Sequence, residues 1–207
     1  MDQKDFRNSR IVKFTSDVDI DFADRQQILN LIPHIGASIL NDKGEFVPHN
    51  TGVHITQIPH DSIKNRATID YKLAEKRGYI KLDFLNVGLY QKIENSDHLQ
   101  ELMNREPPWH KLYDPNFCSQ LMHIGNHYDT LIKMPEAVNT ILKLAMFLAI
   151  IRPAKRHLIG LPWNEVASTV WDKPTDDSYY FKKSHSISYA HLVVVNMNLA
   201  DLADQSN

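Results

Sequence analysis

Acidic and apolar residues alternate without interruption near the start of the chain, in the stretch Ser16-Asp17-Val18-Asp19-Ile20-Asp21-Phe22. This period of two residues is typical of a half-buried β-strand. Successive side chains of a strand point to opposite faces, so the three acids are expected to share one face and the three apolar residues to enter a core. Neighbouring acids on that face lie roughly 6.5–7 Å apart, which is twice the rise per residue. A divalent cation such as Mg²⁺ fits between two such carboxylates and offsets their repulsion.

A second alternating stretch follows, Gly78-Tyr79-Ile80-Lys81-Leu82-Asp83-Phe84-Leu85. The pattern predicts a strand with its apolar residues inward and with Lys81 and Asp83 outward. If this strand lies beside the first, Asp83 joins Asp19 and Asp21, and Lys81 borders the cluster. Three carboxylates with a nearby lysine suit phosphoryl transfer, in which metals and cations neutralise charge. Spacing alone leaves a second interpretation open, namely a strand face that is merely solvated.

Composition narrows the class of protein. The chain has 207 residues, 43% of them hydrophobic, and a net charge of −2. This length allows one large domain or two small ones. The near-neutral charge excludes a bulk basic field, so contact with nucleic acid has to come from local basic clusters. The longest apolar run is far shorter than the ~20 residues of a membrane span. With a single cysteine, Cys118, the sequence indicates a cytoplasmic protein without a membrane partner.

The order of the predicted elements indicates an α+β protein with a strand-rich first half and a helical second half. We expect a domain over residues 1–103, a linker over residues 104–115 around Pro107-Pro108, and a helical region over residues 116–207. In the first domain, Asp24 is placed to cap a short helix that ends before Pro33. The other predicted elements are a strand over residues 34–40, extended segments over 46–48 and 52–57, a loop over 58–66, and helices over 68–77, 88–102, 117–133, 135–151 and 184–202.

A pair of histidines and two basic clusters are the remaining patterns of interest in the sequence. His123 and His127 would share one helical face, but no glutamate or cysteine pair completes a zinc motif around them. Basic residues cluster in Arg152-Pro153-Ala154-Lys155-Arg156 and in Lys182-Lys183. Both clusters are consistent with solvated loops and with contacts to phosphate.

Eight segments, taken in order, resemble segments of one known family. They are residues 16–22, 34–39, 46–48, 56–57, 80–85, 119–121, 151–153 and 181–190. Ile80-Lys81-Leu82-Asp83-Phe84-Leu85 is similar to the Val-Lys-Phe-Asp-Phe-Leu of that family. Phe181-Lys182-Lys183-Ser184-His185-Ser186-Ile187-Ser188-Tyr189-Ala190 is similar to its Phe-Asn-Lys-Ser-His-Ser-Ala-Ala-Tyr-Ala. The family is the bacterial and phage C-family of DNA polymerases, typified by the DNA polymerase III alpha subunit, and the resemblance covers its palm and fingers.

The resemblance implies a polymerase-beta-like nucleotidyltransferase palm sheet followed by abbreviated helical fingers. It implies that Asp19, Asp21 and Asp83 are the catalytic carboxylates and the ligands of Mg²⁺ or Mn²⁺. It further implies two-metal DNA-directed DNA synthesis on DNA and dNTP. The residues expected near the nucleotide or DNA are Lys81, Arg152, Lys182, Lys183 and His185.

The chain also departs from the family pattern. No counterpart of the Gly-Ser-rich loop that holds the triphosphate occurs before Asp17, and residues 160–180 replace the fingers block with its Arg-Arg-Ala-Met-Gly-Lys-Lys pattern. We therefore expect replication proteins as partners that supply missing parts. The alternative interpretation is a catalytically silent module that binds DNA or the replisome.

Overall fold

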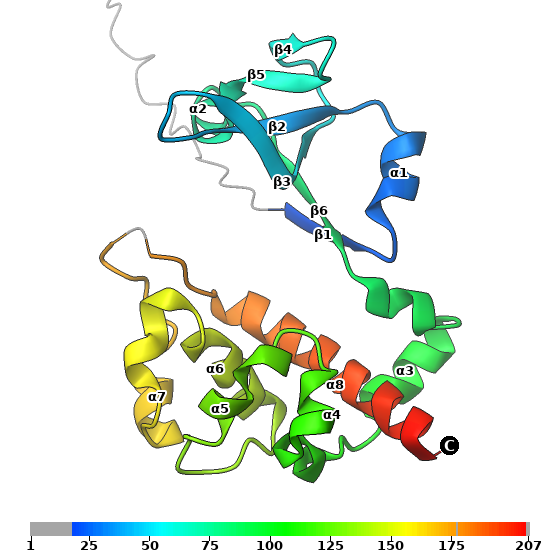
Figure 1. Cartoon of the computed structure of the whole chain (residues 1–207), viewed down its shortest axis with the longest axis vertical. Helices are drawn as coiled ribbons and strands as arrows, with labels where there is room; N and C mark the ends of the chain where they lie inside the picture. Colours follow the sequence, from blue (N-terminus) through cyan, green and yellow to red (C-terminus); the bar gives the residue numbers. More distant parts are fainter. Residues whose placement is uncertain (1–17, 177, 206–207) are drawn as a thin grey trace, which may run out of the picture. The chain divides into compact units, whose positions relative to one another are not determined.

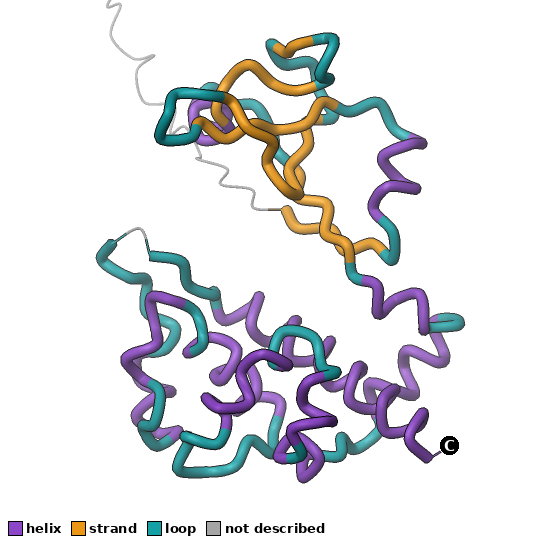
Figure 2. Tube along the Cα trace, viewed as in Figure 1, coloured by secondary structure: helices purple, strands orange, loops and turns teal. Residues whose placement is uncertain are grey.

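The computed structural model describes residues 18–176 and 178–205, so Asp17, the first of the alternating acids, lies outside the described residues. The chain divides into two compact units between Lys92 and Ile93 (Figure 1). Strands gather in the first unit, and the second unit is helical (Figure 2). The predicted α+β class is confirmed.

Six strands of the described residues form one mixed sheet in the order β1-β6-β3-β2-β5-β4. The pairs β1/β6 and β2/β5 are parallel, and the other neighbours are antiparallel. The strands are β1 Val18–Phe22, β2 Ile35–Leu40, β3 Phe46–His54, β4 His60–Asp61, β5 Arg66–Asp70 and β6 Leu82–Asn86. The two extended segments predicted over 46–57 are therefore one strand, and the loop predicted over 58–66 contains β4.

Helices cover the two faces of this sheet. On one face, Leu29 of α1 (Arg25–Leu31) packs with Val53 and Phe84 in a small apolar cluster. On the other face, Ala74 of α2 (Tyr71–Lys76) packs with apolar residues of β2 and β5. As predicted, Asp24 caps α1: its carboxylate accepts a hydrogen bond from the backbone N–H of Gln26 at 2.9 Å. A 3₁₀ turn, η1 (Gly88–Lys92), ends the unit.

The second unit is built around two helices. Seven consecutive residues, Leu144 to Ile150, are buried in α6 (Ile141–Ile150), which packs against α8 (Lys183–Gln205). The remaining elements are α3 Ser96–Asn104, η2 Trp109–Tyr113, α4 Pro115–Ser119, η3 Gly125–His127, α5 Tyr128–Leu131, η4 Pro153–Leu158 and α7 Trp163–Thr169.

The long helices predicted over 117–133 and 135–151 are broken. Gly125 lies so close to the carbonyl of Ser119 that a Cβ there would be 2.7 Å from its oxygen, so the chain turns tightly at this point. α6 begins at Ile141 and not at Pro135, because the Thr140 hydroxyl caps the helix by accepting a hydrogen bond from the N–H of Lys143. The final helix agrees with the prediction.

Polar bonds attach α3 and η2 to α8. The side-chain amide of Asn198 donates to the carbonyls of Leu102 (2.8 Å) and Arg105 (3.1 Å). The buried carboxylate of Asp201 pairs with Arg105 (3.3 Å) and Lys111 (2.9 Å). Residues 96–113 therefore belong to the helical unit. None of the described helices is both long enough and apolar enough to cross a membrane.

Candidate functional site

Two acids predicted to cooperate lie opposite each other in the sheet. β1 and β6 are parallel neighbours, and their register places Asp19 beside Asp83 and Asp21 beside Leu85. Residues in register on neighbouring strands point to the same face, so Asp19, Asp21 and Asp83 share one face. We call this the acidic face, and α2 lies on the same side of the sheet. The two acidic strands are therefore neighbours, which is the condition under which the sequence placed Asp83 with Asp19 and Asp21.

Lys81 and Asp83 were predicted to point outward, away from the apolar side of the strand. Asp83 does lie on the face opposite Phe84, but this face is covered and not open. Lys81 is 6% exposed and Asp83 is 7% exposed, and their charged groups form an ion pair. The reason is that β6 lies inside the sheet, between β1 and β3, and the face is covered. The ring of Tyr71, the first residue of α2, has its centroid 5.5 Å from the Lys81 ammonium.

The second carboxylate oxygen of Asp83 is bound as well. The Thr51 hydroxyl donates to it at 2.7 Å. Thr51 belongs to residues 49–52 of β3, where the pairing with β2 is irregular. Gly52 lies opposite Asp83 in the register between β3 and β6. A Cβ at Gly52 would lie 2.8 Å from the Lys81 side chain and 2.9 Å from His49 Nδ1, so only glycine leaves room for both.

The neutral imidazole ring of His49 stabilises the conformation of residues 49–52 in β3. Its Nδ1 accepts hydrogen bonds from the backbone N–H groups of Gly52 (2.9 Å) and Thr51 (3.3 Å). Burial, and then the charge of Lys81, lower the pKa of His49. Nδ1 lies 3.7 Å from the Asp83 carboxylate, but an accepting nitrogen carries no proton, so this contact is not an ion pair.

The two acids of β1 are in different surroundings. Asp19 is exposed. Asp21 is half-buried and accepts a hydrogen bond from the Tyr90 hydroxyl at 3.3 Å. Burial raises the pKa of Asp21, and the bond from Tyr90 acts in the opposite direction. Asp21 thus gains proton affinity relative to a solvated aspartate.

The oxygen donors of the acidic face suit Mg²⁺ in their chemistry, because Mg²⁺ prefers carboxylate ligands. Asp19, Asp21 and Asp83 are the residues that would hold it. Within residues 18–176 and 178–205, however, no three carboxylate, imidazole or thiolate side chains are gathered closely enough to form a metal-binding group. Asp83 contributes its two oxygens to Lys81 and Thr51 instead.

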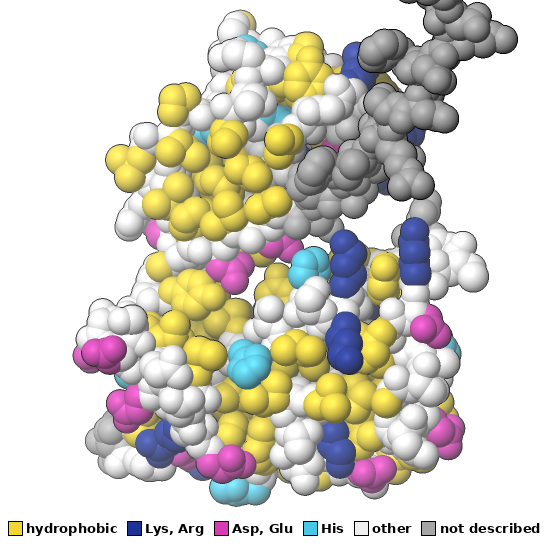
Figure 3. Space-filling model, turned by 180° about the vertical axis from the view of Figure 1, so that it is seen from behind, with side chains coloured by type: hydrophobic (Ala, Val, Ile, Leu, Met, Phe, Trp, Pro, Cys, Tyr) yellow, Lys and Arg dark blue, Asp and Glu magenta, His cyan; other side chains and the backbone are white. Residues whose placement is uncertain are grey.

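The basic residues singled out in the sequence lie in the helical unit, apart from Lys81. Arg152 precedes η4, and its guanidinium lies 4.0 Å from the centre of the Phe181 ring. Burial lowers the pKa of Arg152. Lys182 and Lys183 are exposed and, with His185, they stand at the beginning of α8. The structure therefore brings Arg152 next to the segment that starts at Phe181. Figure 3 shows Lys and Arg side chains (dark blue) among apolar ones on one face of this unit.

Several residues that shape the acidic face were absent from the sequence prediction. Thr51, His49, Tyr71 and Tyr90 reach it from β3, α2 and η1. No local pattern marks them, since each is placed by the register of a distant strand or by a packed helix.

In comparisons with protein-family models, with curated proteins and with solved structures, nothing matches the chain.

Proposed function

We propose that the chain is a metal-dependent nucleotidyltransferase of the DNA-polymerase type, with the sheet unit as a polymerase-beta-like palm and the helical unit as shortened fingers. One observation carries the proposal: the register of β1 and β6 sets Asp19 beside Asp83, on a face shared with Asp21 and next to Lys81. Acids on two neighbouring strands beside a cation are what phosphoryl transfer requires of a protein. The resemblance of residues 80–85 to the family segment supports the same assignment.

In this proposal each charged residue has a task. Asp19, Asp21 and Asp83 hold Mg²⁺ or Mn²⁺, and the metal, when bound, neutralises phosphate charge and activates the primer 3′-hydroxyl. Lys81 supplies a fixed positive charge beside the carboxylates. Tyr90 orients Asp21 through its hydroxyl.

The start of α8 is the proposed contact with nucleotide or DNA. The positive end of the helix dipole and two exposed lysines, Lys182 and Lys183, coincide there, and no acidic residue occurs in the first turn. Lysines at this end of a helix oppose its dipole, so their presence favours an anionic ligand over a role in helix stability. His185 lies in the same turn. Arg152 reaches this segment through Phe181. Replication proteins are the proposed partners, and the cytoplasm is the proposed compartment.

One observation favours a second candidate function. The ion pair with Lys81 and the bond from Thr51 already engage Asp83. Because both oxygens of Asp83 are used in contacts within the sheet unit, they are less available to a metal ion. This arrangement suits a protein that binds a partner without catalysing a reaction. The alternative is therefore a catalytically silent module that binds DNA or a replication protein.

Primer extension with the full chain separates the two functions. The reaction contains a primed DNA template, dNTP and either Mg²⁺ or Mn²⁺, and it is repeated with replication proteins added. Asp19→Asn is the informative variant because Asp19 is exposed, and its matched control is Asp42→Asn, another exposed acid of the same unit. Extension by the wild type and by Asp42→Asn, with loss in Asp19→Asn, is the result we expect. No extension from the wild type under any of these conditions, together with retained DNA binding, would establish the binding module instead.

A further inference from the structure

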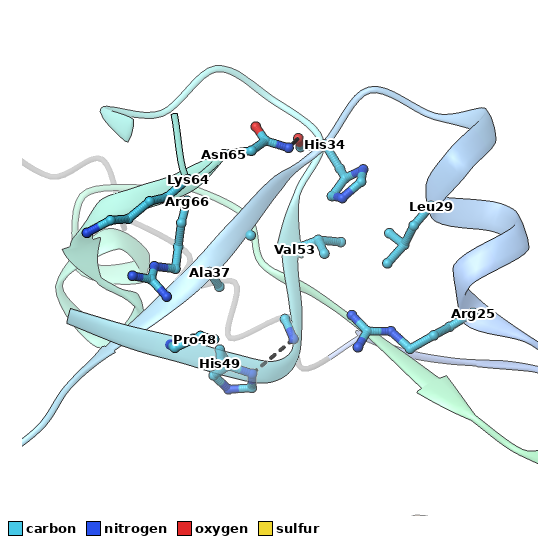
Figure 4. A pocket seen from close by; sticks show the side chains of 12 residues that line it. Arg25, Leu29, His34, Ala37, Pro48, His49, Val53, Lys64, Asn65 and Arg66 are labelled. Carbon is cyan, nitrogen blue, oxygen red and sulfur yellow. Dashed lines mark hydrogen bonds between the residues drawn. The ribbon is translucent and has the colours of Figure 1, made fainter. Parts of the chain in front are cut away.

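A second site lies in the sheet unit, at a cavity of about 290 Å³. Figure 4 shows it bounded by α1 on one side and by β2, β3 and the start of β5 on the others. Its polar lining side chains are Arg25, His34, His49, Lys64, Asn65 and Arg66. Arg25 approaches from the side of α1, and Arg66 approaches from β5 (Figure 4). No residue of the described lining is an aspartate or a glutamate.

The positive charge of this cavity is poorly compensated. The Arg25 guanidinium donates to two backbone carbonyls, those of Asn50 (2.7 Å) and Thr51 (3.4 Å), and its buried Nε has no partner among the described residues. Neutral carbonyls orient a guanidinium without cancelling its charge. Across the described parts of the chain, no acceptor bonds to the Arg66 guanidinium either.

Two acids outside the lining approach its residues. Asp83 lies 3.7 Å from His49 Nδ1 but already pairs with Lys81. Asp61 stands opposite Arg66 in the β4/β5 pairing and approaches Lys64 to 3.9 Å. Both members of the Lys64–Asp61 pair are well exposed, so water and salt screen this attraction. Arg25 and Arg66 therefore keep their charge available inside the cavity.

The lining also indicates what kind of anion fits. It contains no Phe, Tyr or Trp, the side chains with the largest flat faces for stacking a nucleobase. Guanidinium groups match phosphate oxygens by two parallel hydrogen bonds. A cavity of this volume is at the small end of ligand sites, which suits a short polyphosphate.

The cavity is connected to the acidic face through residues 49–52. The carbonyls of Asn50 and Thr51 hold Arg25, while the Thr51 hydroxyl holds Asp83. His49 lines the cavity and bonds to the backbone of the same turn. A ligand that binds the Arg25 guanidinium would compete with these carbonyls, and one of them belongs to Thr51, whose hydroxyl bonds to Asp83.

We propose that this cavity binds phosphate groups, with Arg25 and Arg66 as the anchoring residues. The inference deepens the proposed function by giving the substrate phosphates a binding site, but the binding itself requires no catalysis. The phosphates can come from a free nucleotide or from a nucleic-acid backbone, and the two sources present the same oxygens.

Calorimetric titration of the full chain, without metal, tests the proposal. The probes are pyrophosphate, inorganic triphosphate and a single-stranded oligonucleotide that lacks terminal phosphates. Arg66→Gln is the main variant, because no bond within the described chain depends on its guanidinium. Arg25→Gln is the second variant, and Arg77→Gln, an exposed arginine outside the lining, is the matched control. Far-UV circular dichroism reports whether each variant is folded.

We expect Arg66→Gln and Arg25→Gln to raise the Kd of a phosphate probe at least tenfold and Arg77→Gln to leave it unchanged. Loss of pyrophosphate and triphosphate binding supports the proposal and identifies a nucleotide as the source. Loss of oligonucleotide binding alone supports it and identifies a backbone phosphate. No phosphate binding by the wild type, or equal binding by folded Arg66→Gln, overturns it. Phosphate binding without primer extension rejects the enzyme and retains the site, so the two failures are distinguishable.

Discussion

Asp83 of β6 forms an ion pair with Lys81, which lies just before the strand begins, and both residues are more than nine-tenths buried. Ion pairs in such surroundings lose much of their hydration, and their attraction offsets this cost only with good geometry and further hydrogen bonds. Thr51 supplies one such bond to Asp83. The pair therefore matters to the fold of the sheet unit whatever its role in chemistry.

Asp83→Asn is expected to destabilise the sheet unit by about 3–5 kcal/mol, because it leaves the Lys81 charge buried without a partner. The double change Lys81→Met with Asp83→Leu removes both charges and is expected to recover most of that loss. Amide hydrogen exchange of peptides from β6 is the measurement, since the three tryptophans (Trp109, Trp163 and Trp171) lie in the other unit and their fluorescence does not report on this one.

Lys64→Gln is the control for this experiment, because the pair of Lys64 with Asp61 is exposed. It is expected to leave exchange from β6 unchanged. A double variant as unstable as Asp83→Asn would show that the effect comes from lost packing and not from the unpaired charge.

Gly52→Ala is expected to destabilise the same unit by about 1–3 kcal/mol, since the added methyl group meets Lys81 and His49 at less than 3 Å. The matched control is Gly88→Ala, where nothing lies within 4 Å of the new Cβ. Urea unfolding followed by far-UV circular dichroism compares the two variants. Equal midpoints for both would mean that residues 49–52 move aside freely, and the described packing at Asp83 would be wrong.

Local sequence patterns predicted those strands and helices that depend mainly on residues close together in the sequence. Alternation marked β1 and β6, Asp24 marked the start of α1, and a final helix was predicted over residues 184–202, where α8 lies. The prediction for α6 was wrong at its start, because two helix-start signals, Pro135 and Thr140, compete within six residues and only packing decides between them.

The surroundings of the acids could not be predicted from the sequence. Alternation tells which side chains share a face, but a covered face and a solvated one give the same pattern. Lys81 and Asp83 are buried because Tyr71 and Thr51 arrive from α2 and β3. Those contacts depend on the register between distant strands, which no short motif contains.

Stability is expected to fall as the pH is lowered through about 6.5, the pKa of an unfolded histidine. Burial lowers the pKa of His54, which is completely buried, although its hydrogen bond to the Ile80 carbonyl acts in the opposite direction. Between the folded and unfolded pKa values the unfolded chain binds more protons, so the free energy of unfolding decreases by at most about 1.4 kcal/mol per pH unit for each such histidine.

His54→Asn keeps a donor near the Ile80 carbonyl but does not titrate, so it is expected to flatten this pH dependence. His60→Asn is the control, since His60 makes a similar bond to the Ile58 carbonyl (2.9 Å) but is exposed. Urea midpoints between pH 5 and pH 8 provide the comparison. Identical slopes for the wild type and His54→Asn would exclude His54 as the source.

Binding of DNA is expected to depend on salt through the lysines at the start of α8. Each lysine that neutralises a phosphate contributes about 0.9 to the slope of log K against log salt for duplex DNA and about 0.7 for a single strand. The double change Lys182→Ala with Lys183→Ala should therefore reduce the slope by roughly 1.4–1.8. Arg152 is left in place, because its guanidinium packs on Phe181 and its removal would disturb the fold as well as the charge.

Lys43→Ala with Lys173→Ala removes the same charge at exposed positions elsewhere and should leave the slope near that of the wild type. Equal slopes for the two double variants would mean that the lysines act only through net charge, and the start of α8 would then lose its assignment as a phosphate contact.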